Sequence, residues 1–409
     1  METNHDPREF IRQLQQVLIS GNKKIGFFLG AGSSMIKEKP TSDGKSVMSL
    51  VPGIKEITKE VEKNITNKKK AKAIAAIKKE IESEGKIFHI ENLLSKVVQK
   101  EQVVGAEKLC GLHRSEFKEL QKDVETEIRK LVSIHKEKDL LKWINTHQKF
   151  AKWINEASRK NGVEIFTTNY DYLIEIAFEQ SSYPYYDGFV GSFNPFFYSQ
   201  SVENESLLSH WTKLWKIHGS LGWDIEESSK KIIKANKDGD KIIIFPSIEK
   251  YDNSKKQPYI SYLDRLSKFI RNDDSVLFIC GYSFGDDHIN EIILSALSRT
   301  RTGCAISLLF DDFDEKSQIH SLAKNESSLS VYGKRNAIIG GKLGKWMLKS
   351  QPSLTDDIQV GQYFLQDAAV PRNPTGKGDE ENPMTGDFLL VDFIKFVEFV
   401  SKNSFTNTL

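Results

Sequence analysis

Short apolar runs, each closed by a polar or glycine-rich turn, restrict the fold of this chain more than any other feature. The runs are continuous rather than alternating in polarity, which is typical of strands buried on both faces. Helical patterns follow several of them, and strands separated by helices imply βαβ crossovers. The runs are residues 25–29, 163–168, 214–217, 275–280 and 305–310. They predict an α/β fold with a Rossmann-like, doubly wound parallel sheet.

A long segment with almost no strand signal separates the first run from the second. Residues 54–82 are rich in Lys, Glu, Ala and Ile, and residues 114–160 carry Leu, Trp and Phe at helical spacing. We therefore predict a helical insertion over 54–160 that could cap the sheet, set in a core formed by 1–53 and 161–350. The lysines of the insertion favour a solvated helix face over DNA contact.

The composition shifts again towards the C-terminal end of the sequence. Residues 351–409 are predicted to form an extension, in which a turn-rich segment over 371–386 precedes the apolar tail FLLVDFIKFVEFV. The tail has helical or strand character, and we expect it to pack on the core or on a partner chain. Earlier, residues 230–245 place two apolar runs around Asp238-Gly239, which predicts a β-hairpin.

Charge and cysteine content exclude several classes of protein. The 409 residues include 58 Lys and Arg against 56 Asp and Glu, so the chain as a whole is not an electrostatic nucleic-acid binder. Cys110, Cys280 and Cys304 form no CxxC pair, which argues against a four-cysteine zinc site and favours a reducing compartment. Because no segment reads as a signal peptide or a membrane span, we expect a cytoplasmic protein.

The first candidate site motif is Gly30-Ala31-Gly32-Ser33, directly after a predicted strand. Glycines let a backbone turn sharply and approach a pyrophosphate, whose charge then faces the N–H groups of the following turn. Met35 stands where a dinucleotide fingerprint has its third glycine. A tight turn that binds no ligand is the alternative interpretation of this motif.

The second motif, Thr168-Asn169-Tyr170-Asp171, follows another predicted strand. Ligands of open parallel sheets collect at the carboxyl ends of strands, and an Asn side chain can both donate and accept hydrogen bonds there. The alternative is a helix cap formed by Asn169 or Asp171.

Two further strand ends carry groups suited to chemistry. His218 precedes Gly219 after the run LWKI, and a histidine suits proton transfer near neutral pH. A structural histidine is the alternative. Gly281 and Ser283 follow the run SVLFIC, where a small residue and a hydroxyl suit a nucleotide, and Asp286 and Asp287 after them are interpreted as a helix start.

These four turns, in this order, resemble the sirtuin family between about residues 20 and 310. The resemblance implies that Gly30, Ala31, Gly32 and Ser33 cradle the phosphates of NAD. It implies that Asn169 orients the reactive ribose or a water, and that Asp171 contacts the nicotinamide end.

The later turns extend the resemblance. By likeness to the family, His218 is the catalytic histidine, and Gly281 and Ser283 hold the adenosine half of NAD. The chain departs from the family at Thr168, which stands where the family has Gln, and it lacks the zinc-binding cysteines. The resemblance therefore implies NAD as substrate without zinc, and water rather than an acyl-lysine as acceptor.

The chain is most similar to the sirtuin-like NADases of bacterial antiphage defence, which deplete NAD on infection. That likeness implies an abortive-infection effector that forms a homo-oligomer and works with a separate partner. A HerA-type ATPase is the favoured partner, and a short Argonaute is the alternative. Direct binding to nucleic acid or to a membrane is not expected.

Other functions stay open at this point. An NAD or ADP-ribose sensor would need Gly30, Gly32 and Ser283 but not His218. A deacylase is disfavoured by the missing cysteines. A nuclease is disfavoured because the candidate metal-binding carboxylates, Asp286-Asp287 and Asp311-Asp312, are more simply explained as helix starts and loop charges.

Overall fold

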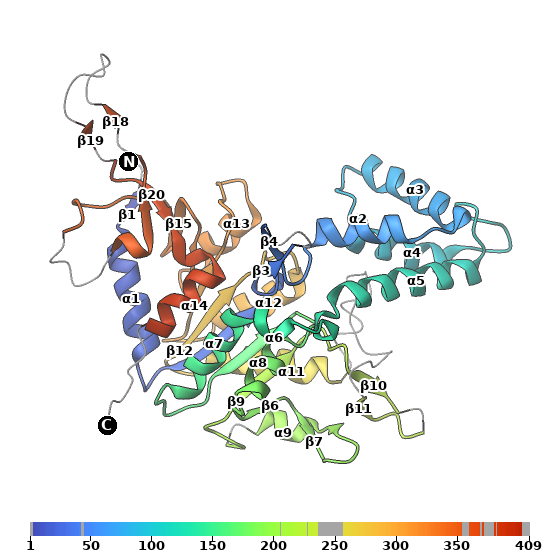
Figure 1. Ribbon diagram of the computed structural model, residues 1–409, viewed down its shortest axis with the longest axis horizontal. Helices are drawn as coiled ribbons and strands as arrows, with labels where there is room; N and C mark the ends of the chain where they lie inside the picture. The colour runs from blue at the N-terminus through green and yellow to red at the C-terminus, as the bar shows by residue number, and fades with distance from the viewer. Residues whose placement is uncertain are drawn as a thin grey trace.

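A mostly parallel sheet with helices on both faces forms the centre of the protein (Figure 1). The computed structural model describes residues 3–41, 45–204, 206–226, 228–235, 257–353, 360–368, 370–371, 380–381 and 383–402. Within these residues the sheet has ten strands, in the spatial order β1 (Thr3–His5), β16 (Lys342–Trp346), β15 (Asn336–Ile339), β14 (Leu329–Tyr332), β13 (Cys304–Leu308), β12 (Ser275–Cys280), β2 (Lys24–Leu29), β5 (Glu164–Thr167), β9 (Thr212–Lys216) and β6 (Tyr185–Tyr186).

The strand order is that of a doubly wound sheet, which confirms the predicted fold class. From β2 the chain adds β5 and β9 on one side, then returns to add β12, β13 and β14 on the other, and all of these strands run parallel. The direction of winding therefore changes at β2, and ligands of such sheets bind at this switch point. Each of the five apolar runs is found as one of these strands.

Helices on the two faces of the sheet cover alternate residues of each strand. On one face lie α1 (Pro7–Ile19), α7 (Asn145–Glu156), α8 (Leu173–Gln180) and α14 (Phe393–Lys402). On the other lie α11 (Tyr259–Arg271), α12 (Asp287–Leu297) and α13 (Gln318–Asn325). Phe27 packs against the first set and Phe28 against the second, so both successive residues of β2 are buried and the run is apolar throughout.

The helical insertion is present, but most of it does not cap the sheet. Its first four helices project from the body as an arm (Figure 1): α2 (Ile54–Asn64), α3 (Lys68–Ser83), α4 (Ile90–Val103) and α5 (Arg114–Val132). These helices bury their apolar faces against one another, so they need no cover from the sheet. After α6 (Leu140–Trp143), only α7 reaches the sheet, where the ring of Phe150 lies 4.9 Å from that of Phe27.

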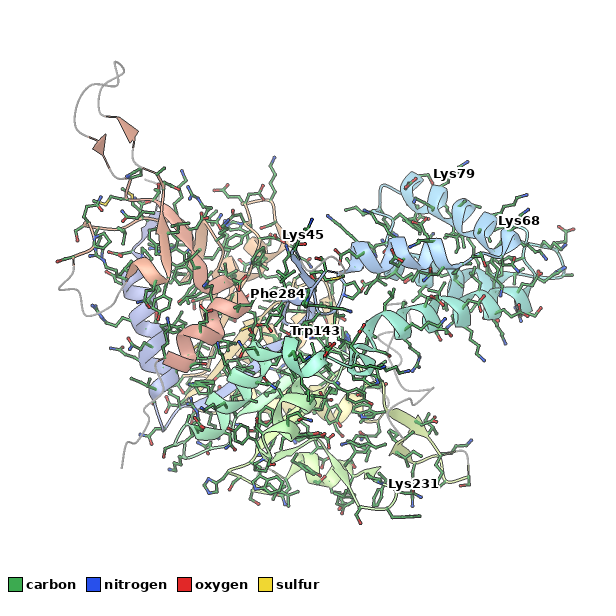
Figure 2. All side chains as sticks on the ribbon, viewed as in Figure 1. Lys45, Lys68, Lys79, Trp143, Lys231 and Phe284 are labelled. Carbon is green, nitrogen blue, oxygen red and sulfur yellow. The ribbon has the colours of Figure 1, made fainter. Side chains whose placement is uncertain are left out.

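The arm exposes its lysines, as Figure 2 shows for Lys68 and Lys79 on α3. Others pair across the arm, for example Lys70 with Asp123 of α5 at 2.7 Å. This arrangement fits the predicted solvated face, because neighbouring helices supply the opposite charges.

The apolar tail is helical and packs on the core. After β17 (Phe364–Gln366) and β20 (Gly386–Phe388), α14 places Phe396 against Phe27 and Phe278, at ring distances of 6.2 and 5.9 Å. Most of the turn-rich segment 371–386 lies outside the described residues. The domain boundaries predicted at residues 54, 160 and 350 stay predictions.

The predicted hairpin over 230–245 is wrong for its first strand. Asp238-Gly239 lies outside the described residues, but β11 (Ile232–Lys234) already has antiparallel partners on both sides. These partners are β10 (Trp223–Ile225) and β8 (Phe196–Phe197), and β7 (Phe189–Val190) completes this small sheet. In the part of the chain that is described, no helix combines the length and apolarity needed to cross a bilayer.

A buried ion pair ties the sheet to α11. Glu164 of β5 and Arg265 of α11 are 5% and 4% exposed. The Arg265 Nε donates to Glu164 Oε2 at 2.8 Å, and the indole N–H of Trp215 donates to the same oxygen at 2.8 Å. Both charges are almost completely shielded from solvent, so the ion pair is expected to matter for stability.

We predict that Glu164→Gln lowers the free energy of unfolding by about 3–5 kcal/mol, because it removes the charge of one partner from a buried, hydrogen-bonded ion pair. Thermal melting of wild type and variant measures the loss. Glu398→Gln is the matched control, since its pair with Lys395 is exposed on α14 and contributes at most about 1 kcal/mol. Equal melting temperatures for the two variants would contradict the prediction.

Candidate functional site

The register of the sheet brings the four predicted turns to one edge. Leu29 of β2 pairs with Cys280 of β12 on one side and with Thr167 of β5 on the other, and Thr167 pairs with Lys216 of β9. These four residues form one row across the sheet. The loops that follow them therefore start at the same level, at the switch point beside β2.

The glycine loop packs directly against the loop after β12. The Gly32 N–H donates to the Gly281 carbonyl at 2.8 Å, and a β-carbon on Gly32 would lie 2.6 Å from the Gly281 Cα. Gly281 itself has φ +65°, a conformation that favours glycine. The glycines thus allow two backbones to touch.

A single 3₁₀ turn, η1 (Ala31–Ser33), follows Gly30. The N–H groups of Gly30, Gly32, Ser33 and Ser34 all donate to carbonyls within these loops. Of the amides from residue 30 to 35, that of Ala31 alone has no acceptor among the described residues. Ala31 is exposed, so its N–H is the loop amide available to a ligand.

Asn169 holds the second loop against the first. Its side-chain Nδ2 lies 3.0 Å from the Gly30 carbonyl, 3.1 Å from Ser33 Oγ and 2.9 Å from Ser34 Oγ. The Asn169 side chain is therefore not a helix cap. Its amide orientation leaves Oδ1 directed away from these acceptors, as a hydrogen-bond acceptor in its own right.

Asp171 accepts a hydrogen bond from the start of α8 and also contacts the glycine loop. Its Oδ1 accepts from the N–H of Leu173, the first residue of α8, at 3.0 Å. Its Oδ2 accepts from Ser34 Oγ at 2.8 Å. Thr168 is half-buried, and its backbone N–H donates to the carbonyl of Leu29, the last residue of β2, at 3.3 Å.

Lys216, at the end of β9, holds the loop that contains Asn169 and Asp171 in place. Its Nζ donates to the carbonyls of Tyr170 and Asp171 and to Glu175 Oε1, the last at 2.8 Å. Burial raises the pKa of Glu175, and the Lys216 charge opposes that rise. The sequence interpretation missed this lysine, although a Lys inside the apolar run LWKI was a signal for a buried partner.

His218 follows Lys216 by two residues and reaches across the edge of the sheet. Its Nε2 lies 3.4 Å from Asp286 Oδ2, on the loop after β12. The exposed fraction of the His218 side chain is 12%, so the ring is accessible at the edge without being free in solvent. The structure thus places His218 beside Asp286 of the loop that follows Gly281 and Ser283.

The loop after β12 is held by its own polar contacts. The Tyr282 hydroxyl donates to Asn290 Oδ1 at 3.0 Å, and Asn290 Nδ2 donates to the Phe284 carbonyl at 2.8 Å. Ser283 is exposed and makes no side-chain hydrogen bond to the other predicted site residues.

His147 of α7 supports the site from beneath and was missed by the sequence interpretation. It is 1% exposed, its ring hydrogen-bonds to the backbone of Ser33, and Phe393 of α14 lies 5.9 Å away. Burial lowers the pKa of His147 to about 4. The nearby Asp171 charge and the Ser33 backbone act in the opposite direction and limit this decrease. Its Nδ1 has no hydrogen-bond partner in the described part of the chain.

Comparison with known proteins finds one family model that matches part of the chain. Residues 163–330, less than half of the chain, match the family model of the SIR2-like domain. The matched segment contains Asn169, His218 and Gly281 and begins after the glycine loop. The match supports a sirtuin-like relationship. No curated protein matches the chain. Among the described residues, no group of three or more His, Cys, Asp or Glu side chains is placed to hold a metal ion.

We predict that His147 makes the protein less stable in mild acid. Between pH 6.5 and about 4, the unfolded chain protonates this histidine and the folded protein does not, so its contribution is complete above pH 6.5 and is lost as the pH falls through that window. Melting temperatures of wild type should therefore fall more steeply over this range than those of His147→Gln. His210→Gln, at an exposed histidine, should keep the wild-type slope. Parallel curves for wild type and His147→Gln would refute this assignment.

Proposed function

We propose that this protein hydrolyses NAD to ADP-ribose and nicotinamide. The observation that carries the proposal is the position of Asn169, whose side chain lies against the glycine loop at the switch point, with His218 on the same edge of the sheet. SIR2-like domains are often NAD-dependent enzymes, and Asn169 and His218 both fall within the matched segment.

For this reaction the protein has to position NAD and a water molecule and to assist one proton transfer. The bond between the anomeric carbon and nicotinamide breaks, and its electron pair leaves with the ring nitrogen, which becomes neutral. A water oxygen then bonds to the anomeric carbon and loses one proton. General acid–base assistance at this step is typically worth about 10²–10⁴-fold, and positioning contributes more.

Asn169 and His218 match these two tasks. Asn169 Oδ1 can accept a hydrogen bond from the attacking water or a ribose hydroxyl, because Nδ2 is committed to the glycine loop. The His218 ring can accept the proton directly or through the ribose. The exposed N–H of Ala31, beside Gly32, is available to the phosphates. Gly281 and Ser283 are proposed to contact the adenosine half.

We predict that Asn169→Ala and His218→Ala each reduce NAD hydrolysis by about 10²-fold or more. Release of nicotinamide and ADP-ribose, followed by chromatography, measures the rate. Asn194→Ala and His210→Ala, at exposed positions, are matched controls and should retain wild-type rates. Equal hydrolysis by wild type and Asn169→Ala, including in the presence of the proposed activating partner, refutes the proposal. NAD binding without product, unchanged in His218→Ala, would instead identify a sensor.

The biological role rests on the resemblance alone. We propose an antiphage effector that depletes NAD on infection and is kept inactive otherwise. It acts as a homo-oligomer, and we propose a HerA-type ATPase as its partner in preference to a short Argonaute. NAD consumption by the chain alone and together with a HerA-type ATPase tests the pairing. Activity that rises only in the mixture is expected, and activity that the ATPase leaves unchanged would contradict it.

A further inference from the structure

The Asp286 carboxylate is directed at His218 rather than at its own helix. Asp286 is the N-cap residue of α12, and its carbonyl accepts from the Asn290 N–H at 3.0 Å. Its side chain, however, makes no capping hydrogen bond. The carboxylate Oδ2 lies 3.4 Å from His218 Nε2, and the exposed fractions of the two side chains are 11% and 12%. The helix start therefore does not explain why a carboxylate stands at this position.

The contact spans an unusual distance within the sheet. Two strands, β2 and β5, separate β9, which carries His218, from β12, which precedes Asp286. Three strand spacings amount to about 14 Å. The two loops must therefore lean towards each other over the ends of β2 and β5, where the glycine loop and Asn169 lie.

The backbone on the Asp286 side is held in a conformation that costs free energy. Phe284 has φ +58°, which is uncommon for a bulky residue. Its carbonyl accepts from Asn290, and the Tyr282 hydroxyl lies 3.2 Å from the Asp286 carbonyl. These contacts fix the loop, so Asp286 meets His218 as part of a rigid unit.

We propose that Asp286 is a positioning residue for the reaction, which holds His218 with its ring proton on Nε2 and leaves Nδ1 as the acceptor. This inference rests on the proposed NAD hydrolysis. A neutral imidazole has one N–H and one lone pair, and a carboxylate beside Nε2 selects the N–H for that nitrogen. Nδ1 then takes the proton that the attacking water loses, and the Asp286 charge stabilises the imidazolium that forms.

The tautomer is observable without any turnover. In protein labelled with ¹⁵N-histidine, the His218 signals, assigned by their loss in His218→Ala, should report a protonated Nε2 and an unprotonated Nδ1. Asp286→Ala should shift these signals. Asp287→Ala is the matched control, because Asp287 is exposed on the same helical turn and accepts from Gln318 at 2.7 Å. A proton on Nδ1 in the wild type, or signals unchanged by Asp286→Ala, would overturn the inference.

Kinetics test the role in the reaction. Asp286→Ala should lower kcat at least about 10-fold and leave the KM for NAD within about twofold, with Asp287→Ala at the wild-type rate. Because Asp286 acts through His218, the double variant should be no slower than His218→Ala. Independent, additive losses, or a change in KM alone, would overturn the role. Equal melting temperatures of Asp286→Ala and Asp287→Ala exclude misfolding.

The two proposals fail in different ways. If the wild type, alone and with the proposed HerA-type ATPase, hydrolyses no NAD, the proposed function fails, and the histidine spectra still decide whether Asp286 sets the His218 tautomer. If NAD is hydrolysed and the spectra or the double variant contradict the pairing, the proposed function stands and Asp286 has no part in it.

Discussion

The site depends on the contact between two backbones, at Gly32 and Gly281. A hydrogen bond of 2.8 Å joins them, and neither position has room for a β-carbon. Because these loops touch without side chains between them, the hydroxyls of Ser33 and Ser34 are turned towards the next strand, where Asn169 binds both. A larger residue at either glycine would separate the loops and move the acceptors on which the Asn169 side chain depends. The arrangement of the loops after β2, β5 and β12 therefore depends on the close approach of Gly32 to Gly281.

The sequence was informative where a strand lies between two layers of helices. Continuous apolar runs identified β2, β5, β9, β12 and β13, since every residue of such a strand is buried. It was silent on β16, whose residues alternate between buried and exposed, and on β6, which has only two residues. Helical spacing identified the arm but not its direction, because periodicity reveals that a helix has an apolar face without revealing what covers it.

The same limit explains which site residues were predictable. Asn169 and His218 stand directly after strands, and strand ends can be read locally. Lys216, His147 and Asp286 matter through partners distant in sequence: the carbonyls of another loop, the backbone of Ser33, and a histidine three strands away in the sheet. Asp286 also had a sufficient local explanation as a helix start. Only the fold reveals that its side chain is used elsewhere.

The position of α14 has a consequence for biosynthesis. Phe396 completes the layer over Phe27 and Phe278, and Phe393 covers His147 beneath the glycine loop. The strand and the helix that seal this layer are separated by nearly the whole chain, arm included. A nascent chain that has already made β2, Asn169 and His218 still has an open core beneath them until α14 leaves the ribosome. The support under the glycine loop is therefore among the last parts of the protein to form.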